Sequence, residues 1–281
     1  MVHIVTDSTA DLPKKVADAH RISVMPLNLH FGEEILKDGE DIWAEEFYHR
    51  LSFEATLPTT SQPSPGEFVD LYRRIAKKGD TVISIHLSEK LSGTINSSRL
   101  AGEMLKGEIE VIAVDSSFVT MPLALVVLEA AKAAQEGRAV EEILSRIEWT
   151  QRNMAFYFTV GSLEHLHRTG RIGKATTLLG NLLSIRPILS IKDGLIVPVE
   201  KFRGNSNRLD HRFLDLIRAD LGADPAEVFI IHANAPDEEK RLEETCRERI
   251  PGVKVFSAIA GPIVGVHTGP GAFGLAALPA R

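Results

Sequence analysis

The chain has 281 residues and a formal net charge of −6, with 44% hydrophobic and 25% charged side chains. This length suggests roughly two domains of about 150 residues each, and this composition builds globular cores rather than a disordered scaffold. The negative charge argues against nucleic acid as a partner, because phosphate binding needs clustered lysine and arginine. The single cysteine, Cys246, excludes an internal disulfide and a thiolate metal site.

In the first half of the chain, apolar strand patterns alternate with helical patterns. Strands are predicted over residues 2–6, 22–31, 81–86 and 110–114, and helices over 43–51, 66–77, 94–105, 121–135 and 140–152. Such alternation implies βαβ units and a parallel sheet. We therefore expect an N-terminal α/β domain over residues 1–152.

The second half has a different pattern. A strand is predicted over 155–160, followed by a hairpin of 187–191 and 195–202 around the turn Asp193-Gly194, which suits a primed hairpin turn. Helices over 208–220 and 237–249 alternate with strands over 228–232 and 253–257. This order predicts a C-terminal α+β domain over residues 153–281, with at least one antiparallel pair.

Residues 255–280 contain no lysine, arginine, aspartate or glutamate, and their one ionisable side chain is His267. The length would permit a membrane span, but five glycines and three prolines argue against a continuous helix. We expect a buried strand, a loop and a second buried strand, with residues 267–271 as a polar island. A few polar groups in apolar surroundings are typical of a small-molecule pocket.

Three of the predicted parallel strands end in small polar residues, at 6–8, 86–88 and 115–117. In open α/β sheets, ligands bind beyond the carboxyl ends of the strands. Aspartate at such a place is also a common helix cap, so Asp7 and Asp115 could either cap or line a site.

Two loops are rich in hydroxyl groups. Residues 91–94 (Leu-Ser-Gly-Thr) open a predicted helix, whose N-terminal N–H groups favour an anion. Thr60 and Ser61 lie on a loop held between two prolines. With His267 and Thr268, these groups could converge on one acidic headgroup. The chain has no Walker lysine motif, which argues against a nucleoside triphosphate site.

Three other patterns are weaker. The run 269–274 fits a dinucleotide fingerprint, but it lacks the helix, strand and acidic residue that must follow. His165 and His167 are two residues apart on a predicted helix and therefore point to different faces, so no metal site is expected. Ser92, His267 and Asp7 could form a hydrolytic triad, although the chain has no Gly-x-Ser-x-Gly elbow.

Taken in order, these motifs resemble the DegV family of bacterial fatty-acid-binding proteins, which includes the FakB subunits of fatty acid kinase. The resemblance covers essentially the whole chain. It is carried by residues 7–12 (DSTADL), 60–68 (TSQPSPGEF), 87–94 (LSEKLSGT), 114–116 (VDS), 170–172 (GRI), 187–189 (PIL), 201–204 (KFRG) and 265–271 (GVHTGPG).

The resemblance implies a carrier that is not itself a catalyst and needs no cofactor or metal. One long-chain fatty acid, such as palmitate, would lie between the two domains, with residues 262–281 returning to the interface. A partner kinase would phosphorylate the presented carboxylate. The implied carboxylate site consists of Thr60 and Ser92, supported by Ser61, Gly93, His267 and Thr268. The implied contacts with the kinase are Arg203 and Arg171.

The chain departs from the family pattern at Thr120-Met121-Pro122 and at Thr169. Acyl length and unsaturation therefore cannot be carried over from a relative. Because no signal peptide precedes the first strand, we expect a reduced, cytoplasmic protein without a membrane span, for which transient contact with a membrane surface remains open. Two alternatives also remain open: an acyl-ester or thioester hydrolase using Ser92 and His267, and a regulator that senses lipid and docks another protein.

Overall fold

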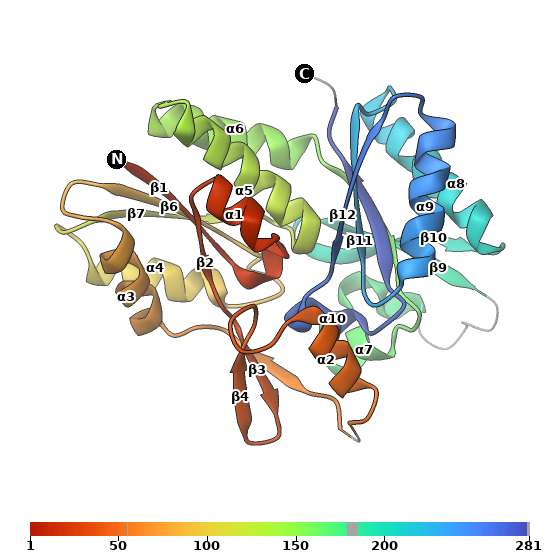
Figure 1. The fold of residues 1–281 in the computed structure, drawn as a ribbon, viewed down its shortest axis with the longest axis horizontal. Helices are drawn as coiled ribbons and strands as arrows, with labels where there is room; N and C mark the ends of the chain where they lie inside the picture. Colours follow the sequence, from red (N-terminus) through yellow and green to blue (C-terminus); the bar gives the residue numbers. More distant parts are fainter. Residues whose placement is uncertain (55, 179–184, 280–281) are drawn as a thin grey trace. The chain divides into compact units, whose positions relative to one another are not determined.

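The computed structural model describes residues 1–54, 56–178 and 185–279. The chain forms two compact units. The first comprises Met1–Trp43 and Thr56–Arg152, and the second comprises Ala44–Ala55 and Asn153–Arg281. Figure 1 shows the first unit mainly in red to green and the second mainly in green to blue.

A four-stranded sheet forms the centre of the first unit, and its strands stand in the order β2-β1-β6-β7. Every neighbouring pair is parallel, which confirms the predicted α/β class. The strands are β1 (Val2–Asp7), β2 (Ile22–Met25), β6 (Thr81–His86) and β7 (Glu110–Asp115).

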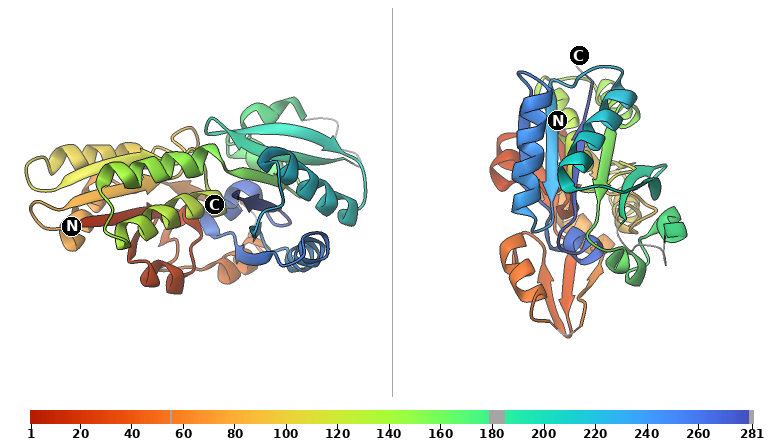
Figure 2. Two further views of the ribbon diagram at one scale, coloured as in Figure 1. Left: turned by 90° about the horizontal axis from the view of Figure 1, so that it is seen from above. Right: turned by 90° about the vertical axis from the view of Figure 1, so that its right-hand side faces the viewer.

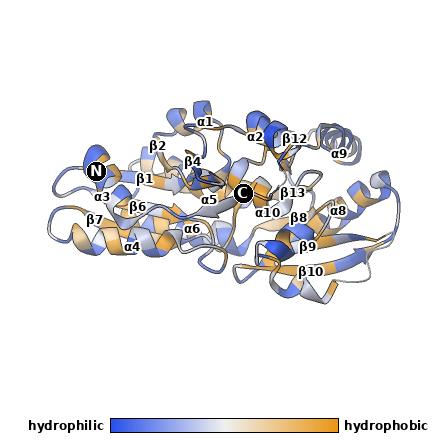
Figure 3. Ribbon diagram, turned by 90° about the horizontal axis from the view of Figure 1, so that it is seen from below, coloured by the Kyte–Doolittle hydropathy of each residue, from blue (hydrophilic) through white to orange (hydrophobic). Residues whose placement is uncertain are grey.

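Helices cover both faces of this sheet. α3 (Pro65–Ile75) packs with α4 (Thr94–Met104), and α5 (Thr120–Gln135) packs with α6 (Val140–Arg152), the green pair in Figure 2. Val5 and Val82 lie in one core cluster with residues of α3 and α4, so alternate strand positions face these helices. Both hydrophobic and hydrophilic colours appear on α3 and α4 in Figure 3, as expected of helices with one buried side. Two short helices also belong to this unit: η1 (Ser8–Ala10) and α1 (Lys14–Ala19).

The prediction of a single strand over residues 22–31 is wrong. This run is divided at Pro26 into β2 and β3 (Asn28–Phe31), which belong to different sheets. Proline has no N–H group to donate to a strand ladder, so pairing stops there. β3 instead forms the middle of an antiparallel sheet with β4 (Glu34–Lys37) and β5 (Thr59–Ser61).

The second unit contains a six-stranded sheet of order β10-β9-β8-β13-β11-β12. All its pairs are antiparallel except β11 with β12, which confirms the α+β class. Asp193 (φ 51°) and Gly194 (φ 77°) adopt the positive φ angles of the expected primed hairpin turn. The strands are β8 (Ala155–Thr159), β9 (Arg186–Lys192), β10 (Leu195–Phe202), β11 (Glu227–His232), β12 (Lys254–Ile259) and β13 (Phe273–Ala277).

The core of the second unit lies between this sheet and the helix pair α8 (Ser206–Leu221) and α9 (Pro236–Arg249). Phe213 of α8 and Leu242 of α9 are fully buried in it, beside Leu275 of β13. The other helices in the described part of this unit are short: α2 (Ala44–Leu51), α7 (Glu164–Arg168), η2 (Gly173–Leu178) and α10 (Pro262–Thr268).

In the uncharged run at 255–280, the structure differs from the expected buried strand, loop and buried strand at two places. β12 is an edge strand and is partly exposed, with Phe256 46% exposed, whereas β13 is buried as expected. Between them lies the helix α10 rather than a loop, so His267 and Thr268 occupy its last turn. Pro262 is at the first helical position and Gly269 lies just beyond the end, and both are common residues at helix boundaries. The many glycines of the run had argued against a helix here.

α2 packs against α10 within the second unit. The hydroxyl of Tyr48 donates to the carbonyl of Ala260 at 3.0 Å, just before α10 begins. A Cβ atom at Gly265 would come within 2.5 Å of the Phe47 ring, so only glycine allows the two helices this approach. A segment from the N-terminal half of the chain thus supports the helix that carries His267.

Candidate functional site

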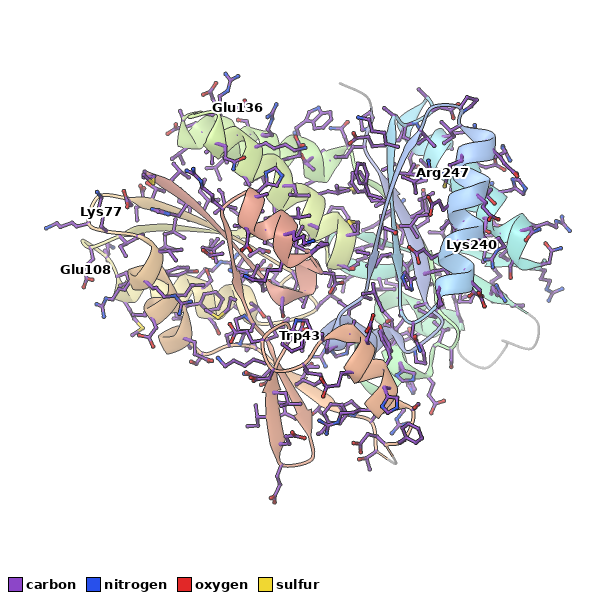
Figure 4. All side chains as sticks on the ribbon, viewed as in Figure 1. Trp43, Lys77, Glu108, Glu136, Lys240 and Arg247 are labelled. Carbon is purple, nitrogen blue, oxygen red and sulfur yellow. The ribbon has the colours of Figure 1, made fainter. Side chains whose placement is uncertain are left out.

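Three parallel strands of the first unit end at one edge of their sheet. β1 ends at Asp7, β6 at His86 and β7 at Asp115, and the register pairs His86 with Asp115. Ligands of open α/β folds bind beyond this edge, where the carboxyl ends of the strands meet. Charged surface residues such as Lys77 and Glu108 lie at the other end of the sheet (Figure 4).

Asp7 and Asp115 both accept hydrogen bonds from the backbone. Asp7 caps η1 by accepting from the N–H of Thr9 at 3.1 Å, and it also accepts from the N–H of Leu87 at 3.0 Å. Asp115 accepts from the N–H of Ser117 at 2.8 Å, and burial raises the pKa of its carboxyl group. Asp7 therefore caps a helix, whereas Asp115 holds the loop before α5, whose N-cap is Val119.

The loop between β6 and α4 carries Ser92 and Gly93. The N–H groups of Leu91 and Ser92 both donate to the carbonyl of Ser88, at 2.9 and 3.1 Å, which fixes the loop as a tight turn. The hydroxyl of Ser92 lies 3.0 Å from that of Thr94, the first residue of α4. A half-buried hydroxyl therefore lies at the N-terminus of an 11-residue helix with no acidic residue in its first turn.

Thr60 and Ser61 lie on the strand β5, whereas a loop was expected here. Thr60 is paired with Leu29 of β3. Successive side chains of a strand point to opposite faces, so Thr60 and Ser61 point in opposite directions. The exposed Ser61 hydroxyl lies 2.8 Å from Nε2 of His30. Thr60 and Ser61 therefore face different surroundings, and only Ser61 lies on the face that carries His30.

Gln62 joins the two hydroxyl-bearing segments. Its Nε2 atom donates to the hydroxyl of Ser97 in α4 at 3.0 Å. The space beside Gly93 is filled by the same amide, because a Cβ atom at position 93 would lie 2.2 Å from Oε1 of Gln62. The structure thus brings the Thr60 segment and the Ser92 loop together. Sequence reasoning missed Gln62, although a glycine directly before a helix is a signal of close approach.

His267 and Thr268 belong to the second unit, whereas Thr60 and Ser92 belong to the first. The hydroxyl of Thr268 donates to the carbonyl of Val264 at 2.9 Å, within α10. Burial, and then the nearby charges of Arg171 and His165, lower the pKa of His267 to about 4. His267 is therefore neutral at pH 7 and can take part in hydrogen bonds without adding a charge.

The two arginines differ in their surroundings. Arg171 is exposed, donates to the carbonyl of Thr169 at 2.5 Å, and lies close enough to His267 to affect its pKa. Arg203 is exposed and directly follows β10. The structure therefore groups Arg171 with His267 and His165.

Within the described residues, no group of three or more histidine, cysteine, aspartate or glutamate side chains could hold a metal ion. Across the same part of the chain, no helix is both long and apolar enough to span a membrane. The sole cysteine, Cys246, is buried in α9, and burial raises the pKa of its thiol to about 12.

The fold and the site together define a two-unit α/β protein that presents uncharged hydroxyls and a helix N-terminus beyond the edge of a parallel sheet. Such an arrangement suits an anion that needs few but well-placed hydrogen bonds. The chain belongs to the DegV family: the family described as "Uncharacterised protein, DegV family" matches residues 1–280.

Two bacterial relatives illustrate the match. A DegV domain-containing protein of Halalkalibacterium halodurans is 41% identical over 276 residues, which covers 98% of this chain and 97% of the relative. The protein DegV of Bacillus subtilis is 35% identical over 276 residues, which covers 98% of both chains. The resemblance drawn from the motifs is therefore confirmed.

Solved structures agree. DegV of Bacillus subtilis, described as a fatty acid binding protein, has a TM-score of 0.89 at 34% identity and 99% coverage of both chains. A DegV protein of Thermus thermophilus, described by its fatty acid binding, has a TM-score of 0.88 at 31% identity and the same coverage. A stearic acid-binding protein of Eubacterium ventriosum has a TM-score of 0.89 at 29% identity, covering 99% of this chain and 98% of its own. These descriptions give the hydrolase alternative no support.

Proposed function

We propose that this protein binds a long-chain fatty acid, such as palmitate, and holds its carboxylate with the hydroxyls of Thr60 and Ser92. The observation that carries this proposal is the bridge from Gln62 to α4, which joins the two hydroxyl-bearing segments at a helix N-terminus. The similar proteins of Bacillus subtilis and Thermus thermophilus are described as binding fatty acids, which supports the same ligand class.

The energetics of a fatty acid suit such a site. Burial of a methylene group is worth about 0.8 kcal/mol, so a long acyl chain brings on the order of 10 kcal/mol before the costs of binding. The carboxylate is the end that is costly to desolvate. Hydroxyl donors and the positive end of the α4 helix dipole can satisfy it without a buried lysine or arginine.

The other parts of the expected site remain predictions. Gly93 contributes by admitting Gln62, and the exposed Ser61 would act only indirectly, by supporting β5. The supporting roles of His267 and Thr268 stay predictions, as does the placement of the acid between domains 1–152 and 153–281 with residues 262–281 closing the site.

The identity of the bound lipid tests the proposal directly. We expect native mass spectrometry of the purified protein to reveal a copurified long-chain acid, and delipidated protein to take up palmitate at one equivalent. A lipid-free protein that ignores added palmitate would rule out the function. Hydrolysis of a chromogenic acyl ester, lost in Ser92→Ala, would instead favour the hydrolase.

We also propose that the protein is a carrier rather than a catalyst, as in FakB-like subunits, and that a separate kinase phosphorylates the presented carboxylate. The exposed guanidinium groups of Arg203 and Arg171 would contact that kinase. A reconstituted acyl-phosphate assay with a fatty acid kinase and ATP would test this. We expect Arg203→Ala to lose phosphorylation but keep palmitate affinity, whereas Arg247→Ala, on the exposed side of α9, should retain both. Wild-type turnover in the Arg203 variant would contradict the assignment.

A further inference from the structure

A continuous chain of buried polar groups lies behind the candidate site, within the first unit. Oδ2 of Asp7 is 2.9 Å from Nδ1 of His86, and Nε2 of His86 is 2.7 Å from the hydroxyl of Ser84. The hydroxyl of Tyr72 lies 2.7 Å from that of Ser84 and 2.7 Å from that of Ser98. All five residues are fully buried. We call this set (Asp7, His86, Ser84, Tyr72 and Ser98) the buried relay.

The hydrogen bonds of the buried relay can all run in one direction. A carboxylate only accepts, so Nδ1 of His86 donates to Asp7 and Nε2 is free to accept from Ser84. Ser84 then accepts from Tyr72, and Tyr72 accepts from Ser98. Burial raises the pKa of Tyr72 to about 12, so its hydroxyl keeps its proton. In this arrangement every polar hydrogen of the relay has an acceptor, as buried polar groups require.

The Asp-His-Ser geometry at one end resembles a catalytic triad, but it does not have that chemistry. The hydroxyl of Ser84 is fully buried and already bonded to both Tyr72 and His86. His86 is also held edge-on against the ring of Phe68, with centroids 5.1 Å apart. No substrate can reach a nucleophile in that position, so the role of the relay is to hold parts of the fold.

The two ends of the buried relay bracket the loop that carries Ser92. At one end, Asp7 also accepts from the N–H of Leu87, the first residue after β6. At the other end, Ser98 lies in the second turn of α4, the helix that follows the loop. The relay therefore fixes both the entry to the Ser92 loop and the helix at its exit.

Resting on the proposed function, we propose that the buried relay is a positioning device for carboxylate recognition, with Tyr72 as its central positioning residue. Tyr72, in α3, is the only member that joins the strand β6, through Ser84, to the helix α4, through Ser98. The alignment of the Ser92 hydroxyl and of the α4 N-terminus with a bound carboxylate then depends on the Tyr72 hydroxyl. The acyl chain does not depend on it.

A pair of ligands that differ only at the headgroup tests this proposal. Dissociation constants for palmitate and for 1-hexadecanol would be measured by competition with a fluorescent fatty acid. We expect Tyr72→Phe to weaken palmitate binding about three- to tenfold, as for the loss of one neutral hydrogen bond, and to leave hexadecanol binding unchanged. The matched control is Tyr157→Phe, which removes the hydroxyl that donates to Asp220 at 2.5 Å in the second unit and should leave both constants unchanged.

Ser98→Ala provides an independent variant in case Tyr72→Phe folds poorly. It should show the same selective loss, and the double variant should lose little more than either single one, because both act through one chain of bonds. Equal weakening of both ligands, or no change for palmitate, would overturn the positioning role. A wild type that binds neither ligand would instead remove the proposed function itself.

Discussion

The side-chain amide of Gln62 reaches the hydroxyl of Ser97 at 3.0 Å and occupies the space that any side chain at Gly93 would need. Gln62 directly follows the strand β5, and Gly93 directly precedes the helix α4. This contact ties the segment that follows Thr60 and Ser61 to α4 and to the loop that carries Ser92. The effects of single side chains on palmitate binding and on stability can therefore be predicted one by one.

Gly93→Ala should weaken palmitate binding without unfolding the protein. The new Cβ atom would lie 2.2 Å from Oε1 of Gln62, so the flexible amide must move and lose its bond to Ser97. We expect the dissociation constant to rise about three- to tenfold in a titration. The control is Gly66→Ala, where the nearest neighbour is the Ser64 hydroxyl at an ordinary 3.8 Å. Comparable losses in both variants would argue against a specific role for Gln62.

Thr60→Ala and Ser92→Ala should each weaken palmitate binding more than Ser61→Ala. Each of the first two changes removes a hydrogen bond to a charged group, worth roughly 10- to 100-fold in affinity. Ser61 points to the opposite face of β5 and contacts His30, so its loss should change binding little. Isothermal titration of the three variants would check the order. Wild-type affinity in the Thr60/Ser92 double variant would refute the headgroup assignment.

Acid should destabilise the protein partly through His267. Its pKa is lowered from 6.5 to about 4 in the folded state, so the folded state disfavours protonation. The stability that this difference provides is present above about pH 6.5 and is lost as the pH falls toward about 4. We expect the midpoint of urea unfolding to fall less steeply over this range in His267→Gln than in wild type.

The exposed His167 provides the matching control for that experiment. His167→Gln removes a histidine from the same unit and should keep the wild-type dependence on pH. If His267→Gln and wild type have parallel profiles between pH 6.5 and 4, burial of His267 does not contribute to acid sensitivity.

Arg241→Gln should destabilise the second unit strongly. Arg241 donates through Nε to the fully buried carboxylate of Asp210 at 2.6 Å. Loss of the Arg241 guanidinium leaves the Asp210 carboxylate without a charged partner, at a cost of roughly 3–5 kcal/mol in the free energy of unfolding. Arg247→Gln, on the same helix, removes only an exposed pair with Glu243 and should cost less than about 1 kcal/mol. Chemical denaturation would distinguish the two, and equal costs would contradict the argument from burial.

Much of the fold could be predicted from local patterns. The period of apolar residues predicted most helices and strands to within a few residues, and Asp193-Gly194 predicted the hairpin turn. The errors occurred where local signals conflicted. Pro26 divides one apolar run between two sheets, and the glycines of 261–269 concealed the helix α10, which tertiary contact with Phe47 and Tyr48 supports.

The sequence by itself determined the classes of the two halves and the residue types of the candidate site, because backbone period and hydroxyl-bearing loops are local properties. Tertiary structure decided which of those hydroxyls can act together. The pleat of β5 places Thr60 and Ser61 on opposite faces of its sheet. Gln62 joins the Thr60 segment to α4, and the buried relay connects Asp7 to Ser98. These relationships depend on side chains that are far apart along the chain and meet only when strands and helices pack, so no local pattern specifies them.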